Sequence, residues 1–383
     1  MSANPPLRIV NARAWDGETA VARDLYIAGG RIVERAAPGA QTVDLAGHTI
    51  FPGLTNAHDH LELNHYPRTK FREVYASAHQ WGEDVSARLD SEPFKALRAF
   101  PLQDRLFIGG LKNLLCGVTA VIHHGPPHRP MFRRDFPVRV LKQYGWAHSL
   151  HFSTDAEIIE SYRRTSRDRP WFIHLAEGTD DSAAGEYQRL KALGCVGPNT
   201  VLVHGVGLTA ADVADAALRI RGLVCCPTTN RYLLNASPPI ERWRAAGGRL
   251  WLGSDSRLTG DGDLLAEYQQ GAFVTSASSA ANLSPALVDV GHLMPGARAD
   301  WFAAPAFPVT RREIALVVRD GMPYIGDAAI MAQFAQTRTV AAVLDGAERR
   351  IHIDLARQIL RCRLREPGLE VDTLPASKRF FRC

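Results

Sequence analysis

The middle of this chain alternates short apolar segments with helical patterns, and this alternation restricts the possible fold more than any other feature. From residue 182 to residue 254 the predicted order is helix, strand, helix, strand, helix, strand. The three helical patterns stop at Gly194, Gly222 and Gly248, and glycine allows a chain to leave a helix. Strands separated by helices pair in parallel, so the pattern favours an α/β fold.

The length of this region selects among α/β folds. Residues 51–294 approach the roughly 250 residues of a (β/α)₈ barrel. An open, doubly wound sheet would carry a glycine-rich first turn, which the sequence lacks. The apolar runs predict strands at 51–58, 117–123, 145–152, 171–175, 200–204, 222–226 and 249–254. We expect the eighth strand to be short, distorted or not evident from the sequence pattern, and we place this loss in the short linker between 152 and 171.

The two ends of the chain have a different, β-rich pattern. Apolar runs flank Gly29-Gly30 near the start and Asp320-Gly321 near the end, and both dipeptides are hairpin signals. We therefore expect residues 1–50 and 295–345 to form one composite β domain beside a barrel at 51–294. Residues 346–383 are predicted to be a C-terminal helical tail, because the segment 351–366 repeats apolar residues at helical spacing.

Composition narrows the class of protein. The chain is 46% hydrophobic and 22% charged, which excludes disorder, and no apolar run is long enough for a membrane helix. The start of the sequence does not resemble a secretory signal, so we expect a cytoplasmic location. The net charge of +5 is concentrated in the tail, a pattern more typical of a solvated helix face than of a nucleic-acid site. Six cysteines without a C-x-x-C pair indicate reduced thiols.

The first candidate for chemistry is the sequence His58-Asp59-His60 at the end of the first predicted barrel strand. Alternate residues of a strand point to one face, so His58 and His60 would both point into the barrel while Asp59 points away. Two imidazoles on one face are half of a metal site. This pair alone could also arise by chance.

Three more polar residues occupy equivalent places. His174 and His204 end apolar strands, and Asp255 follows the last predicted strand. The carboxyl-terminal edge of the strands is where barrel enzymes place their active sites. Buried polar groups at such places are costly unless they are paired or bind a metal. The four strand ends together predict a metal site.

At this point the motifs FPGLTNAHDH, HLAE, VLVHG, CCPTTN and LGSDS, in this order, resemble the amidohydrolase superfamily, in particular its cytosine deaminase and chlorohydrolase-like (ATZ/TRZ) branch. The resemblance covers about residues 5–326. It implies a distorted (β/α)₈ barrel with a small β-sandwich built from both termini. It also implies one divalent metal ion, Zn or Fe, and a small-molecule substrate, with no nucleic-acid or membrane partner. Relatives are often dimers or larger, so a homo-oligomer is a further expectation.

The resemblance also assigns roles to individual residues. His58, His60, His174 and Asp255 match the metal ligands. Glu177 matches the proton-shuttling acid of the H-x-x-E motif; its alternative role is a carboxylate at a helix N-terminus. His204 matches the histidine that contacts the metal-bound water or the substrate, or is itself a ligand. His174 stands where a carboxylated lysine would bridge two metals, which favours a mononuclear site.

We therefore expect a metal-dependent hydrolase that cleaves a C–N bond, with deamination of an aminated heterocycle or amidine-like carbon favoured. Glu177, His204 and Asp255 are the expected catalytic residues. The alternatives are hydrolysis of an amide, lactam or C–halogen bond at the same site, and an inactive binding protein on the same fold. Residues with two open roles, in the pocket or in the structure, are His123, His124, His151, Asn230, Arg68, Lys70 and Arg72.

Overall fold

The computed structural model describes residues 5–270 and 291–374, and the chain divides into two compact units. One unit, called the β unit, contains residues 1–51 and 293–383. The other, called the α/β unit, contains residues 52–292. Within the described ranges, every helix falls short of the length and hydrophobicity that crossing a membrane requires.

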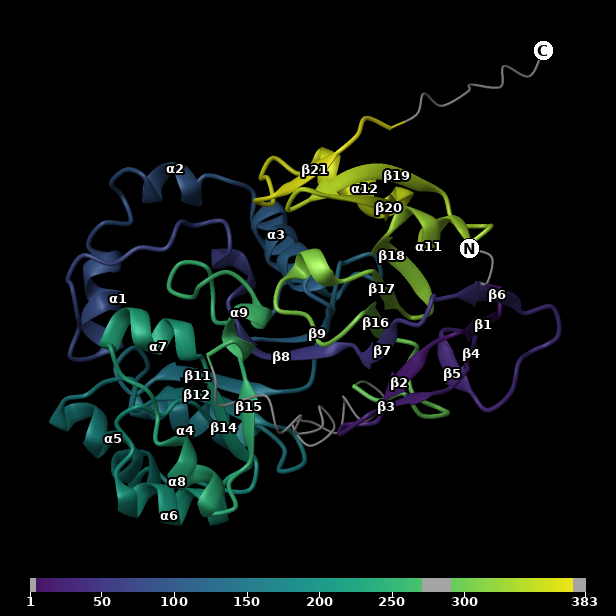
Figure 1. Ribbon diagram of the computed structural model, residues 1–383. Coiled ribbons are helices and arrows are strands. Elements are labelled where there is room, and N and C mark those ends of the chain that lie inside the picture. The colour runs from purple at the N-terminus through teal and green to yellow at the C-terminus, as the bar shows by residue number, and fades with distance from the viewer. Residues whose placement is uncertain (1–4, 271–290, 375–383) are drawn as a thin grey trace. The chain divides into compact units, whose positions relative to one another are not determined.

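In its described residues, 52–270 and 291–292, the α/β unit contains eight strands in two parallel sheets (Figure 1). The three-stranded sheet has the order β10-β9-β8, with bounds β8 (Leu54–Asp59), β9 (Val118–His123) and β10 (Arg139–Val140). The five-stranded sheet runs in chain order through β11 (Gly145–Ser149), β12 (Trp171–Leu175), β13 (Thr200–His204), β14 (Gly222–Cys225) and β15 (Leu250–Leu252). The Asp255 N–H donates to the His58 carbonyl at 3.0 Å, which connects the end of β15 to β8.

Helices connect these strands and cover the five-stranded sheet (Figure 1). Their bounds are η1 (Leu61–Leu63), α1 (Ala78–Ser86), α2 (Phe94–Arg98), α3 (Leu102–Leu115), η2 (Arg129–Phe132), α4 (Asp155–Arg164), α5 (Asp181–Ala192), α6 (Ala210–Arg219), α7 (Pro227–Leu234), α8 (Ile240–Ala245) and α9 (Leu264–Tyr268). Thr209 and Asp212 form a capping box at the start of α6. Gly194, with φ of +72°, follows α5 as the sequence predicts.

The eighth strand is present, but its expected place was wrong. It is β10, which lies between the second and third predicted strands, whereas α4 occupies the linker where we expected the loss. β10 has only two residues, so it shows no alternation that a sequence pattern could reveal. Among the described residues, the connections before and after β10 contain η2 but no α-helix.

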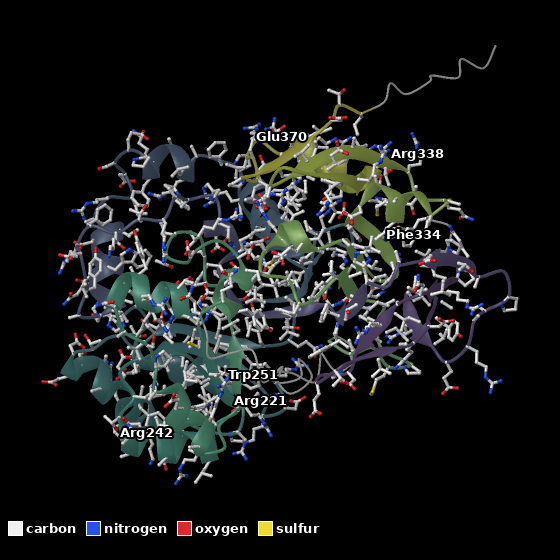
Figure 2. The ribbon with its side chains drawn as sticks, in the orientation of Figure 1. Arg221, Arg242, Trp251, Phe334, Arg338 and Glu370 are labelled. Atoms are coloured by element: carbon white, nitrogen blue, oxygen red, sulfur yellow. The ribbon has the colours of Figure 1, made fainter. Side chains whose placement is uncertain are left out.

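Packing at the edge of the five-stranded sheet depends on one glycine. A side chain at Gly222 would overlap the Trp251 ring, with a closest approach of 2.2 Å. Trp251 is buried and belongs to the apolar cluster inside the unit. Figure 2 labels Trp251 and also Arg221, the residue that precedes β14. The expected helix end at Gly222 was wrong, because α6 ends at Arg219 and Gly222 is the first residue of β14, where it lets β14 and β15 pack closely.

The β unit contains two sheets with strands from both ends of the chain. The four-stranded sheet has the order β5 (Arg31–Val33), β4 (Leu25–Ala28), β1 (Leu7–Val10) and β6 (Gln41–Asp44). The nine-stranded sheet has the order β21 (Leu369–Val371), β19 (Thr339–Leu344), β20 (Ala347–His352), β18 (Met322–Gly326), β17 (Leu316–Arg319), β16 (Trp301–Ala304), β7 (Thr49–Pro52), β2 (Arg13–Trp15) and β3 (Ala20–Ala22). Both predicted hairpins, β4–β5 and β17–β18, are confirmed.

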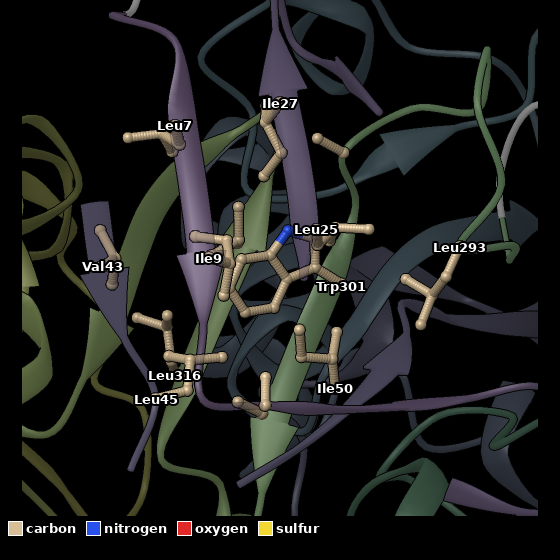
Figure 3. Packing of buried hydrophobic residues seen from close by; sticks show 14 of the residues in the cluster. Leu7, Ile9, Leu25, Ile27, Val43, Leu45, Ile50, Leu293, Trp301 and Leu316 are labelled. Atoms are coloured by element: carbon tan, nitrogen blue, oxygen red, sulfur yellow. The ribbon is translucent and has the colours of Figure 1, made fainter. Parts of the chain in front are cut away.

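The core of the β unit lies between these sheets. Figure 3 shows the Trp301 indole among the side chains of Ile9, Leu25 and Ile50, which come from both sheets. All four side chains are buried. Burial of such large apolar side chains is the main source of stability in a unit of this kind.

The segment 346–383 is more than a helical tail. It contains the helix α12 (Ile353–Arg361), but β20 and β21 in the same segment belong to the nine-stranded sheet. The turn before β20 is Asp345-Gly346, with φ of +49° and +77°, and Asp-Gly is a strong hairpin signal. The remaining elements of the unit are η4 (Arg311–Glu313) and α11 (Ala328–Ala332), and residues 375–383 lie outside the described ranges.

Candidate metal centre

Three histidine side chains from different parts of the α/β unit converge on one point. His58 and His60 come from the end of β8, and His174 comes from β12. The Nε2 atom of His174 lies 3.2 Å from Nε2 of His58 and 3.4 Å from Nε2 of His60. Asp255, just after β15, brings its Oδ1 to 3.9 Å from Nε2 of His58 and 3.7 Å from Nε2 of His60. We call these four residues the histidine centre.

The geometry of the histidine centre fits a divalent metal ion. Nitrogen atoms that bind one tetrahedral metal at about 2.0–2.1 Å are separated by about 3.3–3.4 Å, close to the two distances measured here. Nδ1 of His174 contacts the carbonyl of His148 at 2.8 Å, so it carries the proton and leaves Nε2 with a free lone pair. Burial, followed by the neighbouring histidines, lowers the pKa of His58 and of His174 well below the usual value. Neutral imidazoles are the form that binds metals.

A second group of possible ligands lies beside the first. Atoms of His58, His204 and Cys226 also come within 4.8 Å of one another. Cys226, however, packs in the apolar cluster with Val224 and Trp251. Burial raises the pKa of the Cys226 thiol well above its usual value, which disfavours the thiolate that a metal needs. The first group with Asp255 is therefore the better ligand set.

The backbone at three strand ends has the left-handed conformation that residues with a side chain rarely adopt. The φ angles are +53° at Ala176, +73° at His204 and +50° at Asp255. Such residues are strained and cluster at functional sites, where the surrounding structure maintains them. At this edge of the sheet they orient the residues that form the cavity.

Glu177 and His204 lie next to the histidine centre. Nδ1 of His204 contacts Oδ1 of Asn230 at 2.8 Å, so this nitrogen is the donor and Nε2 is left free. Oε1 of Glu177 lies 3.5 Å from that Nε2. Burial, then the charges of Asp255 and Glu186, raise the pKa of Glu177 well above the usual value. This shift favours the protonated carboxyl, which faces the free Nε2 of His204 as an acceptor.

Asp255 is fixed by two hydrogen bonds. Its Oδ1 accepts from the Ser256 N–H at 2.8 Å, and its Oδ2 accepts from the Thr259 hydroxyl at 3.0 Å. Partners of this kind orient a ligand carboxylate before any metal binds. Asp255 is thus held with one oxygen toward the histidine rings.

Asp59 points away from the histidine centre, as predicted, into a second polar cluster. Its Oδ2 lies 2.9 Å from Nζ of Lys112, and both side chains are fully buried. Asn113 donates to Oδ2 at 2.7 Å and Asn64 donates to Oδ1 at 2.8 Å. Lys112 also donates to the Ser254 hydroxyl at 3.1 Å. We call Asp59, Lys112, Asn56, Asn64, Asn113 and Ser254 the aspartate network.

The sequence reasoning missed the partners of Asp59 in this network. Lys112 lies in α3, where most neighbouring residues are apolar and buried. A lysine in the middle of a buried helical segment was the available signal, since such a residue is almost never buried unless it is paired.

One cavity of about 440 Å³ opens onto the histidine centre. His60, His174, Glu177, His204 and Asp255 all line it. Aromatic side chains form much of the remaining wall: Tyr66, Trp81, Phe94, Trp146 and Phe152. Among the described residues, no lysine or arginine lines this cavity. It suits a small, flat molecule more than an anionic one.

The remaining candidate residues fall in different places. His124 lines the cavity and stacks on His174, with ring centroids 4.1 Å apart. His151 lies outside the residues that line the cavity. Its Nε2 contacts Oε1 of Glu83 at 2.9 Å, and its ring stacks on His79. Asn230 contacts His204 and also lies outside the lining.

The three basic residues after the first barrel strand are engaged with the protein. Arg68 donates to the carbonyls of Thr228 and Thr259, Lys70 donates to that of Tyr232, and Arg72 pairs with Asp84. None of them lines the cavity. The structure therefore offers no support for an anion-binding role of these three side chains.

Comparison with known proteins gives a consistent picture. No protein-family model matches the chain. The sequence is 24% identical to 8-oxoguanine deaminase of Pseudomonas aeruginosa, over 77% of this chain and 83% of that protein.

Two solved structures share the fold. A zinc-bound adenosine deaminase from Xanthomonas campestris aligns with a TM-score of 0.67 at 17% identity, over 86% of this chain and 97% of the other. The atrazine chlorohydrolase TrzN from Arthrobacter aurescens, complexed with zinc, aligns with a TM-score of 0.68 at 15% identity, over 86% and 99%.

Proposed function

We propose that this chain, a metal-dependent hydrolase of the amidohydrolase superfamily, deaminates an aminated heterocycle with one divalent metal ion, Zn or Fe. The reaction replaces an amino group on a ring carbon by a hydroxyl or its lactam tautomer; water is consumed and ammonia is released. The observation that carries the proposal is the histidine centre with the buried carboxyl group of Glu177 beside it, 3.5 Å from Nε2 of His204. The similarity to a curated deaminase supports the same conclusion.

In this proposal His58, His60, His174 and Asp255 hold the metal ion. We infer that the parallel strands of the two sheets belong to a distorted (β/α)₈ barrel, with these residues at its carboxyl-terminal edge. A metal ion bound there supplies a water molecule whose pKa is lowered toward 7, and so a strong nucleophile near neutral pH.

The chain's own residues move the protons. Glu177 is placed to give its proton to the leaving nitrogen, since it lies in the cavity beside the ligands and its raised pKa keeps it protonated. His204 presents an unprotonated Nε2 3.5 Å from Glu177 and can accept a proton in turn. Asn230 is a positioning residue, because it acts by fixing the tautomer of His204.

The alternative is hydrolysis of a C–halogen bond, which the fold similarity to the chlorohydrolase TrzN favours. A halide leaves as an anion and needs no proton, whereas an amino group leaves readily only when protonated. A buried carboxylic acid beside the ligands thus favours the deaminase. Hydrolysis of an amide or lactam uses the same groups and remains a further alternative.

Other properties belong to the same proposal. We propose a small-molecule substrate and a cytoplasmic location, and the five described cysteines are buried and form no disulfide with one another, as suits a reducing compartment. Cys383 lies outside the described residues.

The test compares wild type with the variant Glu177→Gln and measures two products, ammonia and chloride. Zinc-loaded protein is assayed for ammonia release from 8-oxoguanine and adenosine, and for chloride release from atrazine. Wild type should release ammonia from an aminated ring, and Glu177→Gln should lower kcat by about 10² to 10⁴ with little change in KM. Metal content should remain the same in the variant, since Glu177 is not a ligand. Chloride release that is unaffected by Glu177→Gln, without ammonia release from any base, would favour the chlorohydrolase.

A further inference from the structure

A carboxylate that the proposed mechanism does not use lies in the same cavity. Glu62 belongs to η1, two residues after the ligand His60, and lines the cavity. Its Oε2 is buried and has no hydrogen-bond partner in the described part of the chain. Buried acceptors almost always have a donor, so an acceptor without one at a cavity wall calls for an explanation.

The nearest imidazole does not supply the missing proton. Nδ1 of His123 lies 3.7 Å from Oε2 of Glu62, beyond hydrogen-bond distance. That nitrogen accepts the Leu61 N–H at 3.4 Å, so its lone pair is turned toward the backbone and it carries no proton for Glu62. The cavity lining offers no lysine or arginine within the described ranges. The donor must therefore come from a molecule in the cavity.

Gly125 keeps the space beside Glu62 open. A Cβ atom at this position would lie 3.7 Å from Oε1 of Glu62 and 3.0 Å from Nε2 of His123. Gly125 itself lines the cavity. A side chain there would fill the room in which a ligand could reach the carboxylate.

We propose that Glu62 is a specificity-determining residue, which accepts a hydrogen bond from an unsubstituted ring N–H of a neutral heterocyclic substrate. The inference rests on the proposed function, because it assigns the substrate to the class of free bases. The aromatic walls at Trp81 and Trp146 suit a flat ring. A base whose ring nitrogen bears a methyl group or a sugar lacks the donor and leaves Glu62 unpaired. Sites built to bind an N–H reject such analogues strongly.

The experiment measures binding to zinc-loaded protein by titration calorimetry. The probes are guanine, 8-oxoguanine, adenine and cytosine, each beside its ring-N-methyl derivatives, with adenosine and 2′,3′-dideoxyadenosine as the sugar-bearing pair. Wild type should bind at least one unsubstituted base about tenfold or more tighter than its methyl derivative. Glu62→Met keeps the length of the side chain but removes both acceptor oxygens, so it should weaken binding of that base by about 10- to 100-fold. It should leave the methyl derivative nearly unchanged, so that the preference disappears.

Two further variants keep the test decisive. Glu83→Met removes an exposed carboxylate that contacts His151 outside the cavity lining, and it should change none of these affinities. Gly125→Ala keeps every carboxylate but narrows the space beside Glu62, so it should also weaken binding of the unsubstituted base. This variant replaces Glu62→Met in the test if Glu62→Met no longer binds zinc. The inference is wrong if wild type shows no preference for an N–H in any pair, or if the preference persists in zinc-loaded Glu62→Met. It is also wrong if Glu62→Met weakens only the binding of adenosine and leaves that of 2′,3′-dideoxyadenosine and of the free bases unchanged.

This outcome is separable from that of the proposed function. Binding that depends on Glu62 without ammonia release from any base would refute the deaminase and keep the specificity residue. Ammonia release that is indifferent to Glu62→Met would refute the specificity residue alone.

Discussion

Two polar clusters lie on opposite faces of the end of β8, and neighbouring residues of this strand contribute to both. His58 and His60 point into the histidine centre, and Asp59 between them points into the aspartate network. Both clusters also draw on the end of β15, through Asp255 and Ser254. Strand alternation explains how one tripeptide reaches two opposite environments.

The difference lies in how the polar groups are satisfied. In the aspartate network a carboxylate meets an ammonium group and amide donors, so the charges and hydrogen bonds balance within the protein. In the histidine centre three ring nitrogens and a carboxylate face one another, and all four are acceptors when the imidazoles are neutral and carry their protons on Nδ1, as His174 does. The first cluster is complete by itself, and the second needs a cation. We infer that the network positions the ligands and the centre binds the metal.

The largest effect is expected from breaking the histidine centre. His174→Ala removes one of three ring nitrogens, so metal binding and turnover should both be lost. The fold should remain, because the side chain lies at a strand end next to the cavity. Metal analysis, turnover and circular dichroism of the same preparation check this. A variant that still binds one metal ion per chain with full turnover would separate His174 from the centre.

The next effect comes from the aspartate network. Lys112→Met leaves Asp59 buried without its counter-ion, which should lower the free energy of unfolding by about 3–5 kcal/mol in the metal-free protein. Metal affinity should also fall by about 10- to 100-fold, as it does when groups that orient ligands are lost. Denaturant unfolding and zinc titration measure the two quantities. The double variant Asp59→Asn with Lys112→Met should regain part of the stability; unchanged stability in the single variant would contradict the role of the pair.

A smaller effect is expected at the pair Asn230 and His204, which lies beside the histidine centre and belongs to neither cluster. Asn230→Leu removes the acceptor for Nδ1 of His204, so the ring can adopt the other tautomer or rotate. We expect kcat to fall by about tenfold to a hundredfold while metal content stays the same. A kcat profile against pH should shift in the same variant, which loss of packing alone would not produce. Full turnover with an unshifted profile would show that His204 needs no orientation.

The residues that the sequence could reveal are those whose place follows from local geometry. His58 and His60 share a face because a strand alternates, and His174, His204 and Asp255 meet because parallel strands end at one edge. Thr209 and Gly194 mark helix ends by their own chemistry. These features require only the residues nearby and the general form of the fold.

The residues that it could not reveal depend on contacts between distant segments. Lys112 meets Asp59 across more than fifty residues of sequence, and no local pattern joins them. Glu62 is significant only because its Oε2 has no donor among the described residues, a fact that appears only when the whole cavity wall is known. β10 is too short to show a periodicity, and β20 was hidden by the helical pattern that follows it.

The central claim is that the histidine centre binds one catalytic metal ion, and metal stoichiometry coupled to activity tests it most directly. The protein is stripped with a chelator and titrated with zinc or ferrous iron, while bound metal and ammonia release from the best substrate are measured together. Activity should rise in proportion to bound metal and saturate at about one ion per chain. Full activity in the stripped protein, or saturation by metal in the His58→Ala variant as in wild type, would contradict the central claim.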